Sequence, residues 1–257
     1  RFYREEEIND SNFAKHIASL GDFYVNDAFS CSHRKQASVH GIATFMINRY
    51  AGPLFKSEVE AIDSVLKNKK KPVTCIIGGS KVSTKIEVIS NLIKNVENII
   101  LVGAMANNFH YRTGRKVGKS MLEKNAGETV GKILRMFKDN SCKLYLPEDC
   151  SVAKSKEGTK IDKDFSSIED DDIILDIGPK TIIGIKKIID NSNTVLWNGP
   201  AGYFENNEFA KGTYEIAEKI SENSRGKSLI SVLGGGDTVS AINGINKNLL
   251  FSHLSTA

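Results

Sequence analysis

The sequence has 257 residues, of which 40% are hydrophobic and 26% are charged, a balance that excludes wholesale disorder. Its formal net charge of +4 is mild and suits a small anionic substrate as well as it suits nucleic acid. The longest apolar run, residues 99–106, is too short to span a bilayer, and the charged first twenty residues lack the apolar centre of a secretory signal.

Residues 1–52 predict a small unit with a helix over 12–20, a strand over 23–25 and a polar stretch rich in His and Arg. A Gly52-Pro53 break precedes an amphipathic run over 57–66, which ends in a lysine-rich segment before Pro72. We expect residues 53–72 to form a connecting helix and hinge. The lysines suit the solvated end of that helix better than a nucleic-acid patch, because no aromatic residue accompanies them.

From residue 73 onward, short apolar runs alternate with amphipathic segments. The runs are continuous, as in strands covered on both faces, and they span 73–77, 98–102, 143–146, 173–177, 194–197, 228–233 and 250–254. Isoleucine-rich stripes at helical spacing occupy residues 86–96 and 182–189. This alternation predicts an α/β fold with a doubly wound, Rossmann-like parallel sheet over residues 73–257. The polar segment 154–172 is predicted to be a surface loop or a small excursion from the sheet.

Four cysteines occur without a C-x-x-C pair or a histidine at zinc spacing: Cys31, Cys75, Cys142 and Cys150. We expect reduced, buried thiols, as in a cytoplasmic protein. The sequence starts at Arg1 within structured sequence and ends at Ala257 directly after a strand-like run, so we expect it to be part of a longer chain.

Ligands of an open parallel sheet bind at the carboxyl ends of its strands, and one such end is residues 76–85. There Gly78-Gly79 would let backbone N–H groups approach a phosphate, and the spacing of Thr84 and Glu87 matches a capping box at a helix start. Lys81 and Lys85 lie one turn apart, which makes physical sense if a polyanion sits between them. The alternative is a glycine turn with two solvated lysines.

Two further strand ends carry unusual residues. Residues 231–238 lead through three glycines to Asp237, which is either a helix cap or a ligand of nucleotide-bound Mg²⁺. Residues 195–205 contain Trp197, aromatic neighbours and Glu205, which could frame a nucleoside; the alternative is a buried tryptophan before a tight turn. Three such signals at one edge of a sheet favour a nucleotide site.

Five motifs follow one another along the chain: Arg1-Phe2 before Glu5-Glu6-Glu7, Tyr24-Val25-Asn26-Asp27-Ala28-Phe29 with His33-Arg34, Gly78-Gly79-Ser80-Lys81-Val82, Trp197-Asn198-Gly199-Pro200 with Phe204-Glu205, and Gly234-Gly235-Gly236-Asp237-Thr238. In this order they resemble the phosphoglycerate kinase family. The resemblance implies a two-domain glycolytic phosphotransferase with a carboxyl group as acceptor. It would move a phosphoryl group reversibly between 1,3-bisphosphoglycerate and Mg-ADP, giving 3-phosphoglycerate and Mg-ATP.

The resemblance also implies roles for individual residues. Arg1 and Arg34 would hold the triose phosphate, and Lys81 would be the catalytic residue that steadies the moving phosphoryl group. A larger set would contact the nucleotide: Gly79, Lys85, Asn198, Glu205, Gly235, Gly236, Asp237 and Thr238. Within that set Glu205 would bind the ribose, and Asp237 would bind the Mg²⁺ that accompanies ADP or ATP.

By the same resemblance, residues 1–52 would be the last part of an N-terminal triose-binding domain and residues 73–257 a nearly complete C-terminal nucleotide-binding domain. The family's opening region and its C-terminal end are missing from the sequence. Residues 102–105 replace a glycine triplet that usually lies against adenine, so we expect methyl groups of Val102 and Ala104 to narrow the base pocket. We expect a cytoplasmic monomer that binds neither nucleic acid nor membranes.

A second hypothesis is a nucleotide-binding fragment or scaffold without turnover, since a truncated chain alone can be inactive. The presence of Lys81, Lys85, Glu205 and Asp237 argues against decay of the parent enzyme. A nucleic-acid-binding protein ranks last, because the basic residues are spread along the chain rather than clustered.

Overall fold

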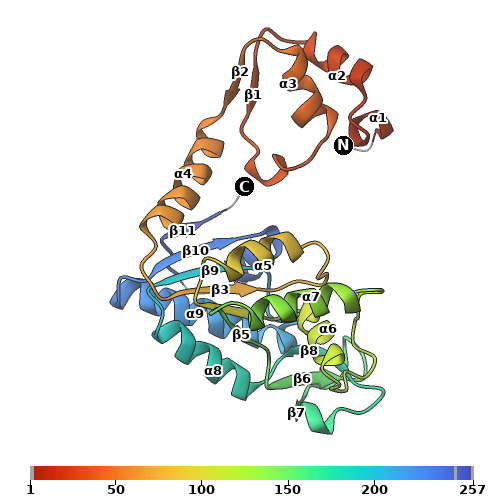
Figure 1. Cartoon of the computed structure of the whole chain (residues 1–257), viewed down its shortest axis with the longest axis vertical. Coiled ribbons are helices and arrows are strands. Elements are labelled where there is room, and N and C mark those ends of the chain that lie inside the picture. Colours follow the sequence, from red (N-terminus) through yellow and green to blue (C-terminus); the bar gives the residue numbers. More distant parts are fainter. Residues whose placement is uncertain (1–2, 246–247, 256–257) are drawn as a thin grey trace. The chain divides into compact units, whose positions relative to one another are not determined.

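The computed structural model describes residues 3–245 and 248–255, which divide into two compact units with a boundary between Lys67 and Asn68 (Figure 1). Because Arg1 lies outside the described residues, its predicted role stays a prediction.

The first unit is built from short elements. Its helical segments are α1 (Arg4–Glu7), α2 (Ser11–Ala18), a 3₁₀ turn (Phe29–Cys31), a π-helical turn (Ala37–Gly41), α3 (Ile42–Phe45) and α4 (Pro53–Asn68). Strands β1 (Tyr24–Asn26) and β2 (Arg49–Ala51) pair in parallel. Helix α2 begins where the Asp10 carboxylate accepts a hydrogen bond of 2.8 Å from the Phe13 amide. The predicted helix and strand at residues 12–25 are thus confirmed to within two residues at each boundary.

The second unit contains a six-stranded parallel sheet. In spatial order its strands are β11 (His253–Leu254), β10 (Ile230–Gly234), β9 (Thr194–Asn198), β3 (Val73–Ile77), β4 (Asn98–Leu101) and β5 (Lys143–Tyr145). All five residues of β3 are buried, as its continuous apolar sequence predicts. The chain moves outward from β3 through β4 to β5 and then returns to β9 on the other side of β3. The doubly wound parallel sheet is therefore confirmed.

Helices cover both faces of this sheet (Figure 1). On one face lie α5 (Ile86–Ile93), α6 (Ala104–Arg112) and α7 (Gly127–Lys138), packed on a core that includes Val73, Cys75 and Ile77. On the other lie α8 (Pro179–Asp190), α9 (Lys211–Gly226) and α10 (Gly236–Asn243), packed on a core that includes Ile76. Successive residues of β3 thus serve opposite cores, as the twofold period of a strand requires.

One strand assignment is corrected. Residues 173–177 form a strand, β8 (Ile173–Ile177), but it belongs to a separate three-stranded antiparallel sheet with β6 (Asp149–Ala153) and β7 (Ile161–Asp164). The predicted loop over 154–172 contains β7 and a 3₁₀ turn (Phe165–Ser167) instead. This segment is ordered because Phe165 and Ile168 are buried with β6 in a small core of their own.

A buried aspartate joins the antiparallel sheet to α8. The Asp149 carboxylate accepts hydrogen bonds from the Lys180 amide (2.9 Å), the Thr181 amide (2.8 Å) and the Thr181 hydroxyl (2.7 Å). Asp149 is 3% exposed, so these bonds to the first turn of α8 replace the water that its charge loses.

Candidate functional site

The winding order of the parallel sheet reverses between β3 and β9, which are neighbours. Such a switch point leaves a crevice at the carboxyl ends of the strands. The loops after β3, β4, β9 and β10 meet there, and they contain most of the residues predicted to bind nucleotide.

Two of these loops touch through their backbones. The Gly78 amide donates a hydrogen bond of 2.8 Å to the Asn198 carbonyl. A Cβ atom on Gly78 would lie only 2.2 Å from the Pro200 carbonyl oxygen and 2.5 Å from that of Gly199. Because both obstacles are main-chain atoms, no other residue fits at Gly78 without moving a loop.

The loop after β4 closes against the same structure. Gly103 has φ +68°, and its amide donates a 3.1 Å hydrogen bond to the Ala201 carbonyl. The Met105 amide donates a 2.8 Å bond to the Gly79 carbonyl. The main chain itself therefore holds three loops in fixed positions around the crevice.

Polar side chains connect the β3, β9 and β10 loops. The Lys85 ammonium donates a 2.6 Å hydrogen bond to Asn198 Oδ1, and the Thr238 hydroxyl accepts a 2.7 Å bond from the Gly199 amide. Burial lowers the pKa of Lys85, and the nearby negative charge of Asp237 partly opposes this shift. A half-buried ammonium with one neutral hydrogen-bond partner can still accept an anion.

The start of α5 differs from the prediction. Its N-cap is Lys85 rather than Thr84, whose hydroxyl donates to the Lys81 carbonyl, so the predicted capping box does not form. The turn before α5 is held by Glu123, whose carboxylate accepts hydrogen bonds from the Ser83 amide (3.1 Å) and the Ser83 hydroxyl. These bonds, the hydroxyl bond foremost, lower the pKa of Glu123, so this side chain remains a carboxylate beside the loop of Lys81.

Asp237 is not a helix cap either. It lies in the first turn of α10, one residue inside the helix, and its side chain is exposed; the N-cap is Gly235, at φ +95°. Gly236 opens the helix, and the side chain of Thr238 is buried. The Asp237 carboxylate can therefore meet a ligand at the mouth of the crevice.

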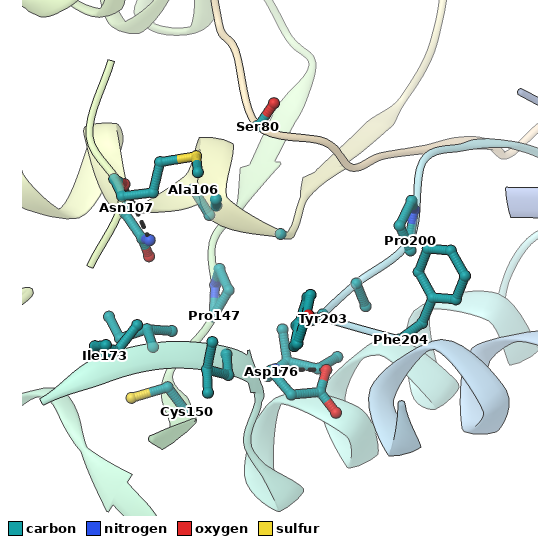
Figure 2. Close-up of a pocket in the computed structure, with 18 of the residues that line it drawn as sticks. Ser80, Ala106, Asn107, Pro147, Cys150, Ile173, Asp176, Pro200, Tyr203 and Phe204 are labelled. Atoms are coloured by element: carbon teal, nitrogen blue, oxygen red, sulfur yellow. Dashed lines mark hydrogen bonds between the residues drawn. The ribbon is translucent and has the colours of Figure 1, made fainter. Parts of the chain in front are cut away.

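A pocket of about 340 Å³ opens between these loops and the antiparallel sheet (Figure 2). We call the part lined by the loops its loop end; that lining includes Gly79, Ser80, Gly103, Pro200, Glu205 and Asp237. We call the part lined by α6, β6, β8 and Phe165 its inner end; that lining includes Asn107, His110, Cys150, Phe165, Ile173 and Asp176. Figure 2 shows Ile173 and Cys150 across the pocket from Pro200 and Phe204.

The pocket gathers some predicted site residues directly and others through their contacts. Gly79, Glu205 and Asp237 line it. Asn198 does not line it but holds Lys85 and the backbone of Gly78. Four further predicted residues lie beside it as described above: Lys85, Gly235, Gly236 and Thr238.

Two predicted residues stand apart from the pocket lining. Lys81 is exposed on the loop after β3, close enough to Glu123 for its charge to lower the pKa of that carboxyl. Arg34 is exposed in the first unit, after the 3₁₀ turn. Their predicted roles rest on the resemblance alone.

Two expectations about the base pocket are corrected. Val102 is fully buried in the core under the sheet and does not narrow the pocket, whereas Ala104 does line it. Trp197 frames no ligand: it is buried, and its indole N–H donates a 2.7 Å bond to the Gly199 carbonyl before the turn. The aromatic residues that line the pocket from this loop are Tyr203 and Phe204.

Sequence reasoning missed Asp176, which joins β8 to the start of α9, beside the Leu175 contact that holds the Glu205 loop. Its carboxylate accepts bonds from the amides of Gly212 (2.8 Å) and Ile177 (2.9 Å), and the Tyr203 amide bonds to the neighbouring Leu175 carbonyl at 2.7 Å. Burial raises the pKa of Asp176 to about 7. Asp176 lies within the apolar run 173–177, and nothing in that run indicates a contact with the distant Gly212.

A cluster of carboxylates lies elsewhere, at Glu169, Asp171 and Asp172. The Lys154 ammonium contacts all three at 2.6, 2.5 and 3.0 Å, and Lys163 contacts Asp172 at 2.8 Å. The lysines thus neutralise a cluster that would otherwise suit a cation.

No helix in the described part of the chain is both long enough and apolar enough to cross a membrane.

Comparison with known proteins adds to this geometry. The family model described as phosphoglycerate kinase matches residues 1–257. The phosphoglycerate kinase of Wolbachia pipientis subsp. Culex pipiens is 46% identical over 244 residues, covering 95% of this chain and 61% of the relative. That of Chelativorans sp. is 42% identical over 259 residues, covering 100% of this chain and 65% of the relative.

Solved structures agree with the sequence matches. Phosphoglycerate kinase from Coxiella burnetii superposes with a TM-score of 0.82 at 36% identity, and the enzyme from Pyrococcus horikoshii OT3 with a TM-score of 0.82 at 27% identity. Each match covers 100% of this chain, and the two cover 65% and 66% of the solved chains.

The doubly wound sheet with a pocket at its switch point places this unit in the doubly wound α/β class, and the relatives that share it are named phosphoglycerate kinases. The chain belongs to the phosphoglycerate kinase family, as the motifs predict. It spans just over three fifths of the length of the curated relatives that it matches.

Proposed function

We propose that this chain carries the nucleotide site of a phosphoglycerate kinase, which transfers a phosphoryl group reversibly between 1,3-bisphosphoglycerate and Mg-ADP. The observation that carries the proposal is the convergence of Lys85, Asn198 and Asp237 at the mouth of one pocket at the switch point of the sheet. In the proposed organisation residues 1–52 contribute to triose binding, 53–72 connect, and 73–257 bind nucleotide. As a glycolytic enzyme it would act in the cytoplasm, as a monomer.

The loop end suits the phosphates of the nucleotide. Gly79 leaves its backbone uncovered, with no atom within 4 Å of where a Cβ would stand, and the N-terminus of α10 presents its positive end beside it. Burial lowers the pKa of Lys85. Negatively charged phosphates nearby would oppose this shift and favour the protonated ammonium.

The donor set also fits Mg²⁺ that arrives with the nucleotide. Mg²⁺ prefers hard oxygen ligands and is usually held by one or two carboxylates together with substrate phosphates and water. Asp237 is one exposed carboxylate at the phosphate end of the pocket, which matches that need. Bound Mg²⁺ would neutralise phosphate charge that Asp237 alone would repel.

Phosphoryl transfer needs positioning and charge neutralisation more than covalent work by the protein. A β-phosphate oxygen of ADP bonds to the phosphorus of the acyl phosphate. The bond from that phosphorus to the C1 carboxyl oxygen breaks, and 3-phosphoglycerate leaves as a carboxylate. In our proposal the exposed Lys81 ammonium stabilises the transferring group, and Arg1 and Arg34 hold the triose phosphate.

The nucleotide site is tested by calorimetric titration of the 257-residue chain with ADP, in the presence of Mg²⁺ and after its removal by a chelator. We expect saturable binding that weakens about tenfold without Mg²⁺, and a similar loss with Asp237→Asn, because one carboxylate–Mg²⁺ contact is removed. The matched control is Asp139→Asn, an exposed aspartate at the end of α7, which should bind as the unmodified chain does. A folded chain that does not bind, or binds equally without Mg²⁺, contradicts the proposal.

A further inference from the structure

The inner end of the pocket contains a histidine whose ring forms no hydrogen bond with any residue that the structure describes. His110 is fully buried on α6, and neither ring nitrogen, Nδ1 or Nε2, has a hydrogen-bond partner among the residues that the structure describes. The ring nevertheless lines the pocket. A polar side chain that is shut off from water and unpaired costs about 1–3 kcal/mol, so its presence requires an explanation.

The ring of His110 is held in place by aromatic packing. Its centroid lies 3.9 Å from that of Phe165, with the two planes inclined by 36°. The Arg115 guanidinium lies 5.4 Å from the Phe165 ring centre, on the same aromatic cluster. Burial first, and then the positive charge of Arg115, lowers the pKa of His110 to about 3. The imidazole is therefore neutral at physiological pH and offers one N–H donor and one nitrogen acceptor.

The surroundings of His110 suit a flat, uncharged ring. Apolar side chains of Phe165, Ile173 and Leu175 line this part of the pocket. Asn107, one turn before His110 on α6, is 2% exposed and donates a weak 3.4 Å bond to the Met121 carbonyl. Among the described residues, Lys156 is the only lysine or arginine in the pocket lining, and its ammonium lies 4.7 Å from the ring centre of Tyr203, on the loop after β9. A phosphate is thus disfavoured here, and a heteroaromatic ring with a hydrogen-bonding edge is favoured.

We propose that His110 is a specificity-determining residue that reads the hydrogen-bonding edge of a purine base at the inner end of the pocket. The inference rests on the proposed nucleotide site and extends it, because phosphates at the loop end would direct the base toward the inner end. Adenine carries an amino donor at C6 directly beside a ring-nitrogen acceptor. The two nitrogens of one imidazole point in different directions, so His110 can form one hydrogen bond with this edge, in which its unprotonated nitrogen accepts from the amino group.

The test is a comparison of two nucleotides and two side chains. Calorimetry measures the affinity of the chain for Mg-ADP and for the Mg complex of purine riboside 5′-diphosphate, which lacks only the amino group at C6. We expect the unmodified chain to bind ADP about three- to tenfold more tightly, the range for one neutral hydrogen bond. His110→Leu should reduce this ratio to about one, and His110→Gln, which keeps a donor and an acceptor, should retain part of it.

The matched control is His16→Gln, an exposed histidine on α2 in the first unit, which should leave the ratio unchanged. Equal affinities of the unmodified chain for the two nucleotides would overturn the inference, as would a ratio that persists in folded His110→Leu and His110→Gln. Both of those results leave Mg-dependent ADP binding intact. Absence of any ADP binding would instead overturn the proposed nucleotide site, and with it the proposal that His110 hydrogen-bonds to the base.

Discussion

The two ends of the pocket are built from different parts of the polypeptide. The loop end is made chiefly of main chain: Gly78, Gly103 and their partners are joined by backbone hydrogen bonds, and its charged side chains, such as Asp237, face water. The inner end is made of side chains from α6, β6 and β8, and it keeps His110 and Asp176 away from water. Solvated charges cost little, whereas buried ones shift toward their neutral forms. The pocket thus suits a ligand that is anionic at one end and neutral at the other.

The largest expected effect comes from closing the space between the two backbones of the loop end. Gly78→Ala places a methyl group 2.2 Å from a main-chain oxygen, so we expect a loss of about 4 kcal/mol in unfolding free energy, or failure to fold. The control is Gly184→Ala within α8, where no atom lies within 4 Å of the new Cβ, and which should stabilise by about 0.5–1 kcal/mol. Denaturant unfolding measures both variants; equal stabilities would show that the loops yield easily.

A second prediction distinguishes the effect of Lys81 on phosphoryl transfer from its effect on stability. Lys81 is exposed, so Lys81→Ala should leave the unfolding free energy within about 0.5 kcal/mol of the unmodified value. If Lys81 stabilises the transferring phosphoryl group, ATP formation from 1,3-bisphosphoglycerate and Mg-ADP should fall at least about a hundredfold. The assay uses the corresponding full-length enzyme, with the exposed Lys119→Ala as the matched control. Transfer that stays near normal would remove Lys81 from the catalytic role.

The smallest expected effect concerns the two ionisable groups of the inner end. Burial lowers the pKa of His110 from 6.5 to about 3, so as pH falls below 6.5 the unfolded chain gains a proton that the folded chain refuses, and stability is lost. Burial raises the pKa of Asp176 from 3.8 to about 7, so its stabilising effect is present below 3.8 and is lost as pH rises toward 7. Between pH 5 and 6.5 the two slopes nearly cancel.

Removing either ionisable group should reveal the pH dependence of stability that the other one contributes. Between pH 5 and 7, Asp176→Asn should lose about 2 kcal/mol of stability relative to the unmodified chain as pH falls, and His110→Leu should lose about 2 kcal/mol as pH rises. The changes of slope are the measured quantities, since each substitution also has a constant cost. The surroundings of these groups include Arg115 for His110, and Lys160 and Asp162 for Asp176, and neither substitution alters them. Parallel pH profiles for all three chains would contradict the pKa shifts.

The sequence predicts the loop end better than the inner end for a physical reason. Only glycine fits where backbones must touch, as at Gly78, and glycine is favoured at the positive φ of Gly235, so both residues mark the loops directly in the sequence. Continuous apolar runs likewise reveal β3, β4 and β9, which are covered on both faces. The glycine motifs could therefore be recognised from single segments of the chain.

The inner end lacks any such local mark. Its side chains come from residues 107–110, 150, 165 and 173–176, which only the fold brings together. Strand β6 went unpredicted because its buried face includes Asp149 and Ser151, whose polarity is satisfied by Thr181 and Asp162. A capping box at Thr84 was predicted and is wrong, because the glutamate that holds this turn is Glu123, from a distant segment.

The hydrogen bonds of Asp149 to the first turn of α8 have a mechanical consequence. They fasten the antiparallel sheet, which forms one side of the pocket, to a helix that packs on the parallel sheet, whose loops form the other side. A wedge-shaped ligand cannot part the two sheets without uncovering this carboxylate. We therefore expect the pocket to keep a fixed width, so that a ligand must be thin enough to enter before it can form hydrogen bonds inside.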